Sequence, residues 1–252
     1  TVFAMLFIGG FLVSGASITI NQIIEKDLDK LMKRTEGRPL PTARLSVSEA
    51  KVFAVVIGLL GIILLAVATN WLTVVLSLVS MVLYCFVYTP LKRVGPVAVF
   101  VGALPGALPP LIGWVAATGT VSIEALVIFA LQFIWQFPHF WAIGWFLYED
   151  YEKAGFFMLP NGKRDQSTVL QTVLYTIWTE LASLIPAFGV TGRLYLTPVS
   201  GVIMGLIGLG FLYFAIRFYK IRTNKVAKQF MLASVSYITL LQIVYVLDKF
   251  IR

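Results

Sequence analysis

Three oxygen-bearing side chains, Asn21, Glu25 and Asp29, follow one another at four-residue intervals at the end of an apolar segment. Each four-residue step along an α-helix turns the side chain by about 40° and advances it by about 6 Å, so all three lie on one face. Mg²⁺ prefers such oxygen ligands and commonly bridges protein carboxylates to a substrate phosphate. The spacing therefore predicts a Mg²⁺ site. The alternative is a solvated helix end, with Glu25 and Asp29 paired to Lys30 or Lys33.

Basic side chains could supply the charge that holds an anion beside such a metal. Carboxylates would bind the metal, while the metal and the basic residues would neutralise phosphate oxygens. The alternative for each basic residue alone is membrane topology and attraction to anionic lipid. The candidates are Lys26, Arg34, Arg38, Lys92, Arg93, Lys153, Lys163 and Arg164.

The only histidine of the chain, His139, lies in the aromatic-rich segment 132–141. It is about 10 Å inside the basic end of its apolar run, and ionisable groups at membrane depth are costly and often functional. A neutral imidazole among aromatic rings could orient a large flat substrate or ligate haem iron. The alternative is a core histidine with a satisfied hydrogen bond, and the residues leave this choice open.

Two further features interrupt apolar runs. Segment 96–117 contains three prolines, which must kink or break a helix, together with Gly102 and Gly106. The prolines indicate either a cavity wall or a packing kink at which the glycines allow close approach. Glu180 lies in the middle of its apolar run, where we expect a hydrogen bond to a neighbouring helix rather than catalysis.

The elements that must position these residues are membrane-spanning helices. Hydrophobic residues make up 59% of the 252 residues and charged residues only 13%, and Cys85 is the single cysteine. This composition excludes soluble enzymes, disordered proteins and disulfide scaffolds. About 20 apolar residues cross a bilayer as a helix. The apolar runs predict an all-α membrane bundle with eight transmembrane helices, at about 3–24, 50–69, 71–90, 96–117, 123–146, 168–190, 195–217 and 230–248.

The loop charges predict how this bundle is oriented. The net charge is +8, and 17 of the 20 lysines and arginines lie in alternate loops. By the positive-inside rule, the loops that begin near residues 25, 91, 147 and 217 face the cytoplasm, and so do the candidate site residues. In a membrane chain this charge indicates cytoplasmic loops, and no nucleic-acid partner is expected. We predict one multi-pass domain over residues 1–252, embedded in the lipid bilayer.

Three motifs carry a resemblance to a known family. The first reads N-x-x-x-E-x-D-x-D-x-x-M-x-R-T-x-x-R-P over residues 21–39. The second combines Y-T-P-L-K-R at 88–93 with the proline-containing stretch 102–114. The third is W-Q-F-P-H-F-W at 135–141, leading into D-Y-x-x-A-G-x-x-M-L-P at 150–160. With these motifs the chain resembles the protohaem IX farnesyltransferases, a branch of the UbiA superfamily of intramembrane prenyltransferases; the first motif alone indicates only the superfamily.

The resemblance implies transfer of the farnesyl group of farnesyl diphosphate to a vinyl group of haem B, giving haem O and diphosphate. Breaking the allylic C–O bond builds negative charge on the diphosphate, which Mg²⁺ and nearby cations would stabilise. The resemblance also implies a bacterial inner (plasma) membrane location and contact with haem A synthase or oxidase assembly factors. The resemblance implies metal binding and catalysis for Asn21, Glu25 and Asp29, and a second metal-binding or substrate-orienting role for Asp150. It implies that the diphosphate is bound by Arg34, Arg38, Lys92, Arg93 and Lys153. It also implies a haem or prenyl pocket lined by Trp135, His139, Phe140, Trp141 and Tyr151.

The sequence departs from that family's pattern at three places. Glu25 stands where an aspartate is usual, and Ala98 stands where an asparagine is expected. Asp150 is accompanied by Glu149 and Glu152 in place of two spaced aspartates. The family is expected to have nine helices, so we expect the first helix to precede this sequence.

Two other functions remain open. Another UbiA-type aromatic prenyltransferase, of the quinone or chlorophyll pathways, would use the same first motif, but His139 and the pair Asp150-Tyr151 argue against it. A transporter would also have broken helices and intramembrane polar groups, often within internal repeats. No repeat of the 21–29 or 105–110 pattern is seen in the second half of the sequence. Formation of a farnesylated haem from haem B, farnesyl diphosphate and Mg²⁺ distinguishes these functions.

Overall fold

The computed structural model describes residues 2–251, and over that range the regular structure is entirely helical. Eight of the described helices are long and apolar enough to cross a membrane. Their number confirms the prediction, and each predicted apolar run corresponds to one span. The spans are Val2–Asp29, Val47–Ala68, Trp71–Leu91, Val97–Thr118, Ile123–Phe146, Gln166–Phe188, Pro198–Ile221 and Asn224–Phe250.

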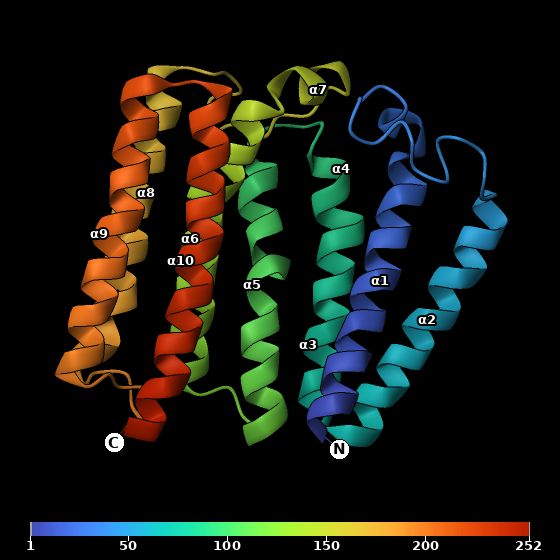
Figure 1. Cartoon of the computed structure of the whole chain (residues 1–252). Helices are drawn as coiled ribbons and strands as arrows, with labels where there is room; N and C mark the ends of the chain where they lie inside the picture. The colour runs from blue at the N-terminus through green and yellow to red at the C-terminus, as the bar shows by residue number, and fades with distance from the viewer. Residues whose placement is uncertain (1, 252) are drawn as a thin grey trace. The chain divides into compact units, whose positions relative to one another are not determined.

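The chain divides into two compact units. This division does not test the predicted single domain, which stays a prediction. The first unit comprises residues 1–121 and 149–157. Its helices α1 and α2 run side by side (Figure 1), and a side chain at Gly61 would lie 2.9 Å from the carbonyl oxygen of Gly9. Small residues thus let the two backbones approach closely. Its elements are α1 (Val2–Asp29), α2 (Val47–Ala68), α3 (Trp71–Val82), a π-helical turn (Leu83–Tyr88), α4 (Thr89–Leu91), α5 (Val97–Thr118) and most of α7 (Tyr148–Lys153).

Helix α1 continues to Asp29, beyond the predicted end of its apolar run at residue 24. The polar end remains helical because its oxygen-bearing residues continue the buried stripe of the helix. After an intervening loop, α2 begins at a capping box, in which Ser46 and Glu49 each bond to the other's backbone N–H. This start is three residues before the predicted apolar run, as the Ser-x-x-Glu spacing favours.

Helix α5 is continuous from Val97 to Thr118 and contains all three prolines that were expected to kink or break it. Gly102 lies in this helix directly against Tyr88, since a Cβ at position 102 would be 2.6 Å from the Tyr88 ring. The glycine therefore has the close-packing role that was one of the two expectations for this segment. Tyr88 belongs to the π-helical turn, which is wider than an α-helical turn and is a common feature of functional sites.

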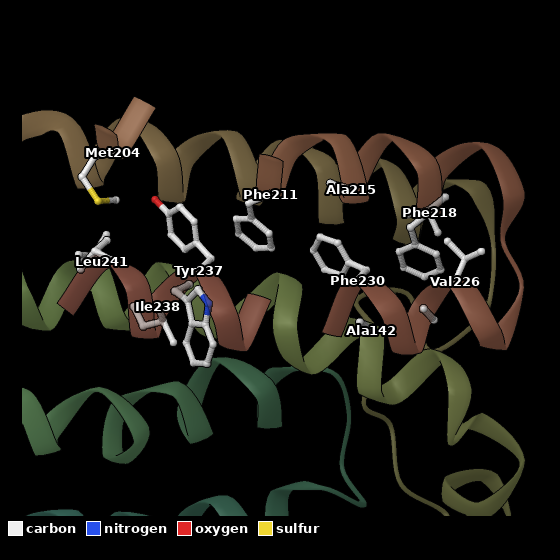
Figure 2. Close-up of a cluster of buried hydrophobic side chains, with 14 of the residues drawn as sticks. Ala142, Met204, Phe211, Ala215, Phe218, Val226, Phe230, Tyr237, Ile238 and Leu241 are labelled. Carbon is white, nitrogen blue, oxygen red and sulfur yellow. The ribbon is translucent and has the colours of Figure 1, made fainter. Parts of the chain in front are cut away.

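The second unit comprises residues 122–148 and 158–252. Its core lies mainly where α9 packs on α10, and Figure 2 shows the side chains that fill it. Phe211 stacks on Phe230 and on Tyr237, with ring centroids 5.3 and 4.7 Å apart. These aromatic rings hold the helices by burying large apolar areas. The elements of the unit are α6 (Ile123–Phe146), α8 (Gln166–Leu184), a 3₁₀ turn (Ile185–Phe188), α9 (Pro198–Ile221) and α10 (Asn224–Ile251).

Candidate active site

The end of α1 buries its three oxygen-bearing residues on one face of the helix. Asn21, Glu25 and Asp29 are 5%, 4% and 0% exposed. Asp27 is exposed instead, and its carboxylate pairs with Lys30 at 3.0 Å. The predicted shared face is confirmed. The alternative, in which Glu25 and Asp29 pair with Lys30 or Lys33 at a solvated helix end, is wrong, because both carboxylates are buried and pair with Lys92 and Arg38.

Each buried carboxylate at the end of α1 is neutralised by a cation from outside the helix. Lys92 Nζ lies 2.8 Å from Glu25 Oε1 and 3.1 Å from Oε2. Arg38 Nη1 lies 2.8 Å from Asp29 Oδ2. The Asn21 side-chain amide donates to the Thr89 hydroxyl at 3.0 Å. Two carboxylates and two cations thus meet at the end of α1, an arrangement that suits the binding of a metal together with an anion.

Lys92 is held in this position by contacts to its ammonium group and to its backbone. Its ammonium lies over the rings of Tyr88 and Phe156, at 4.8 and 5.4 Å from their centroids. Its carbonyl oxygen accepts a hydrogen bond from the backbone N–H of Phe157 at 2.8 Å. Burial lowers the pKa of the Lys92 ammonium, although the Glu25 carboxylate acts in the opposite direction. Burial likewise raises the pKa of the Tyr151 phenol nearby.

One oxygen at the end of α1 has no partner. Asp29 Oδ1 is buried and receives no hydrogen bond, although the other oxygen of the same carboxylate binds Arg38. A buried carboxylate oxygen without a donor is costly, and a cation is the partner that its charge favours. In the described part of the chain, no three His, Cys, Asp or Glu side chains gather as a metal cluster. The available ligand set is therefore two carboxylates and the Asn21 amide.

The remaining predicted diphosphate-binding residues differ in how they are placed. Arg34 is exposed, and its backbone N–H donates to Asp150 Oδ2 at 3.3 Å. Lys153 Nζ is 3.9 Å from Asp150 Oδ1 and is well exposed. Tyr151 packs on Phe156, with ring centroids 6.1 Å apart. Arg93 is exposed and makes no ion pair within residues 2–251, so the structure does not bring it to the carboxylates.

In the second unit, His139 is anchored to α10. Its Nδ1 lies 2.7 Å from the Ser234 hydroxyl oxygen, and its ring stacks on Trp135 with centroids 4.8 Å apart. The Ser234 hydroxyl donates its only proton to the Met231 carbonyl at 2.6 Å, so it accepts from His139 Nδ1–H. This bonding leaves a lone pair on His139 Nε2. The imidazole thus has a hydrogen-bond partner at Nδ1 and can accept a hydrogen bond or bind a metal at Nε2.

The aromatic residues of α6 lie on different faces of the helix, and the haem or prenyl pocket predicted from them stays a prediction. Trp135 and His139 face α10, where the Trp135 N–H donates to the Ser234 carbonyl at 2.8 Å. Trp141 instead packs edge-on against Tyr175 of α8, with centroids 4.9 Å apart. Residues two positions apart on a helix point about 200° apart, so His139 and Trp141 cannot share a face. Phe140 contacts the His139 ring from between these faces, at 5.5 Å.

Several residues of these sites were missed by sequence reasoning. Thr89 and Phe156 were within recognised motifs but carried no signal that they would contact Asn21 and Lys92. Ser234 lies in a segment without a sharp motif. Glu180 was expected to hydrogen-bond a neighbouring helix; its carboxyl group packs against Gly208 of α9, where a Cβ would be 2.6 Å away.

Comparison with known proteins identifies the family. The profile of the UbiA prenyltransferase family matches residues 1–240. The chain belongs to this family. UbiA-family prenyltransferases generally use a divalent metal to ionise the diphosphate. The buried carboxylates of Glu25 and Asp29, with Lys92 and Arg38 beside them, are compatible with such a metal.

Relatives within the UbiA family are similar over nearly the whole chain. A protein of Christiangramia forsetii named protoheme IX farnesyltransferase is 60% identical, over 98% of this chain and 82% of its own length. Proteins of the same name from Flavobacterium psychrophilum and Flavobacterium johnsoniae are 56% and 52% identical, over all of this chain and 83% and 84% of their own lengths.

Solved structures of the UbiA family share the fold at low sequence identity. A digeranylgeranylglyceryl phosphate synthase aligns with a TM-score of 0.77 at 16% identity, over 97% of this chain and 84% of that one. An apo UbiA homologue from Aeropyrum pernix aligns with a TM-score of 0.69 at 16% identity, over 94% of this chain and 88% of that one. These two structures support the fold alone.

Proposed function

We propose that this chain transfers the farnesyl group of farnesyl diphosphate to a vinyl group of haem B, giving haem O and diphosphate. The C1–O bond of the allylic diphosphate breaks, the vinyl carbon forms the new C–C bond, and water adds to the resulting cation with loss of a proton. The observation that carries this reaction is the 52–60% identity to three proteins named protoheme IX farnesyltransferase.

We propose Mg²⁺ as the metal and Asn21, Glu25 and Asp29 as its ligands. Hard oxygen donors suit this ion, and the partnerless Asp29 Oδ1 offers it a ligand atom. Bound there, Mg²⁺ would supply positive charge to the oxygens of the diphosphate as the allylic bond breaks.

The cations paired with these carboxylates are proposed to bind the diphosphate. Lys92 and Arg38 are already oriented beside Glu25 and Asp29, and their N–H groups could donate to phosphate oxygens as charge builds there. Arg34 and Lys153 would contribute long-range attraction from more exposed positions, and Arg93 has the weakest support. The rings of Tyr88 and Phe156 beside Lys92 offer faces that attract positive charge and could shield an allylic cation from water.

His139 is proposed to engage the haem. The Nδ1–H bond to Ser234 fixes the ring and leaves Nε2 as an acceptor, which suits either iron ligation or orientation of the porphyrin. Trp135 and Phe140 contact the His139 ring and are proposed to line the same surface. Trp141 lies on the face of α6 opposite His139, where it contacts Tyr175, and is proposed to line the haem or prenyl pocket from there.

The eight apolar helices make this an integral multi-pass membrane protein. We propose the bacterial inner membrane, with the carboxylate site on the cytoplasmic side. The stretches 25–51, 91–95, 147–167 and 217–229 hold 17 of the 20 lysines and arginines, which by the positive-inside rule favours a cytoplasmic location for them. Haem A synthase or oxidase assembly factors are the proposed protein partners, since a hydrophobic haem product is best passed on directly within the bilayer.

The deciding experiment supplies purified protein in lipid with haem B, farnesyl diphosphate and Mg²⁺. Chromatography with mass detection should show a haem that has gained one farnesyl group and one hydroxyl group. Excess chelator should abolish the product, and Mg²⁺ in excess of the chelator should restore it. A parallel reaction with an aromatic acid of the quinone pathway tests the alternative acceptor. Prenylation of that acid without any farnesylated haem would overturn the proposed function.

A further inference from the structure

The segment 149–157 contains Asp150, for which the sequence suggested a metal-binding or substrate-orienting role. The segment belongs to the first unit, and it bonds to the backbone of the rest of that unit at two positions. Asp150 Oδ2 accepts the backbone N–H of Arg34 at 3.3 Å, and the Phe157 N–H donates to the Lys92 carbonyl at 2.8 Å. It therefore touches both stretches of chain that supply cations to the α1 carboxylates.

The stretch of chain around Arg34 is fixed to the end of α1 by two further bonds. The Thr35 hydroxyl donates to the Asp29 carbonyl at 2.9 Å, and the Arg38 guanidinium binds the Asp29 carboxylate at 2.8 Å. Thr35 is buried, whereas Arg34 is exposed. On the exposed side, the Arg34 backbone is thus held by the carboxylate of Asp150.

Asp150 lacks the features of a metal ligand. Oδ2 is used by the Arg34 N–H, and Oδ1 faces the Lys153 ammonium at 3.9 Å. In the described part of the first unit, the fully buried carboxylate oxygen that receives no hydrogen bond is Oδ1 of Asp29. Within residues 2–251, Glu149 and Glu152 do not join Asp150 in a cluster of three potential ligands.

We propose that Asp150 is a positioning residue: it holds the Arg34 backbone, and thereby Arg38, against Asp29, and it binds no second metal. The consequence for diphosphate binding rests on the proposed function, but the structural role does not. An asparagine at position 150 can still accept the Arg34 N–H through its carbonyl oxygen, whereas an alanine cannot. A metal ligand would be impaired by both changes, because each removes the negative charge.

The first test is limited trypsin digestion of the full chain in lipid, with chelator and without substrates. Cleavage after Lys33 and Arg34, identified by fragment mass, reports how often this stretch opens. Loss of one hydrogen bond should make cleavage in Asp150→Ala about five- to tenfold faster. Asp150→Asn and the matched control Glu152→Ala, an exposed carboxylate on the same short helix, should be cleaved at the wild-type rate. A wild-type rate in Asp150→Ala would overturn the proposal whether or not the protein makes haem O.

The second test measures the Mg²⁺ concentration for half-maximal turnover and the KM for farnesyl diphosphate. Asp150→Asn should match the wild type in both, and Asp150→Ala should raise KM without changing the Mg²⁺ requirement. A raised Mg²⁺ requirement in Asp150→Asn would show that the carboxylate binds metal and would also overturn the proposal. If no variant and no wild-type protein forms product, the proposed function fails while the digestion result still decides the role of Asp150.

Discussion

The Lys92 ammonium and the Glu25 carboxylate form an ion pair with both side chains almost fully buried, 12% and 5% exposed. They are 67 positions apart in the sequence, and both carboxylate oxygens lie within 3.1 Å of Nζ. Removing two ions from water costs several kcal/mol each, so such a pair adds little net stability. A charge pair in this position is better explained by readiness to bind a metal and an anion than by packing.

Variants of the Glu25–Lys92 pair allow effects on turnover to be distinguished from effects on thermal stability. Glu25→Gln leaves the Lys92 charge buried without its partner and removes a proposed metal ligand, so both thermal stability and turnover should fall, turnover by about 100-fold or more. The double variant Glu25→Gln/Lys92→Met should regain much of the thermal stability but none of the turnover. Thermal unfolding in detergent and product formation measure the two effects. Wild-type turnover in Glu25→Gln, or in Asp29→Asn, would refute the metal assignment.

His139 should matter for haem and not for the prenyl donor. His139→Ala should raise the KM for haem B by about tenfold, the loss of one well-oriented contact, and leave farnesyl diphosphate binding unchanged. Ser234→Ala serves as the companion variant, because it keeps the imidazole but removes the acceptor of its Nδ1–H. We expect a smaller rise in the same KM. Equal weakening of both substrates in His139→Ala would identify the residue as structural.

Two glycines of α5 differ in how closely they are packed, so one serves as the control for substitution of the other. A Cβ at Gly102 would be 2.6 Å from the Tyr88 ring, on which the Lys92 ammonium rests, whereas a Cβ at Gly113 meets nothing within 4 Å. Gly102→Ala should displace Tyr88, lower Tm by about 2–4 °C per kcal/mol lost, and reduce turnover. Gly113→Ala should leave turnover unchanged and hold or slightly raise Tm, since alanine favours helix. Equal behaviour of the two variants would contradict the packing role of Gly102.

Asp165 should make stability depend on pH. It caps α8 by accepting the Thr168 backbone N–H at 2.8 Å, and this bond holds the pKa of its carboxyl below the usual 3.8. A lowered pKa in the folded state contributes stability above pH 3.8, and that contribution disappears as the pH falls through the lowered pKa. Asp165→Asn keeps a capping oxygen without charge, so its Tm should be lower than that of the wild type near pH 7 and converge with it toward pH 3. A constant difference across this range would show that the Asp165 charge is irrelevant.

Apolar runs made the number and approximate bounds of the helices predictable, because each membrane helix must carry its own stretch of about 20 apolar residues. The extension of α1 to Asp29 was less predictable. Its last turns bury Glu25 and Asp29, whose charges are neutralised by Lys92 and Arg38 from outside the helix. The prolines of α5 were expected to kink or break the helix, yet no break is present from Val97 to Thr118.

The sequence by itself determined that this is a helical membrane protein, that Asn21, Glu25 and Asp29 share one helix face, and which family its motifs resemble. These conclusions depend on periodicity and local composition, which are properties of short stretches of chain. Only the tertiary structure decided that Lys92 pairs with Glu25, that Asp150 bonds to the Arg34 backbone, and that Trp141 packs on Tyr175 of α8. Such pairings join residues far apart in sequence, and they are fixed by how helices pack and not by spacing along any one of them.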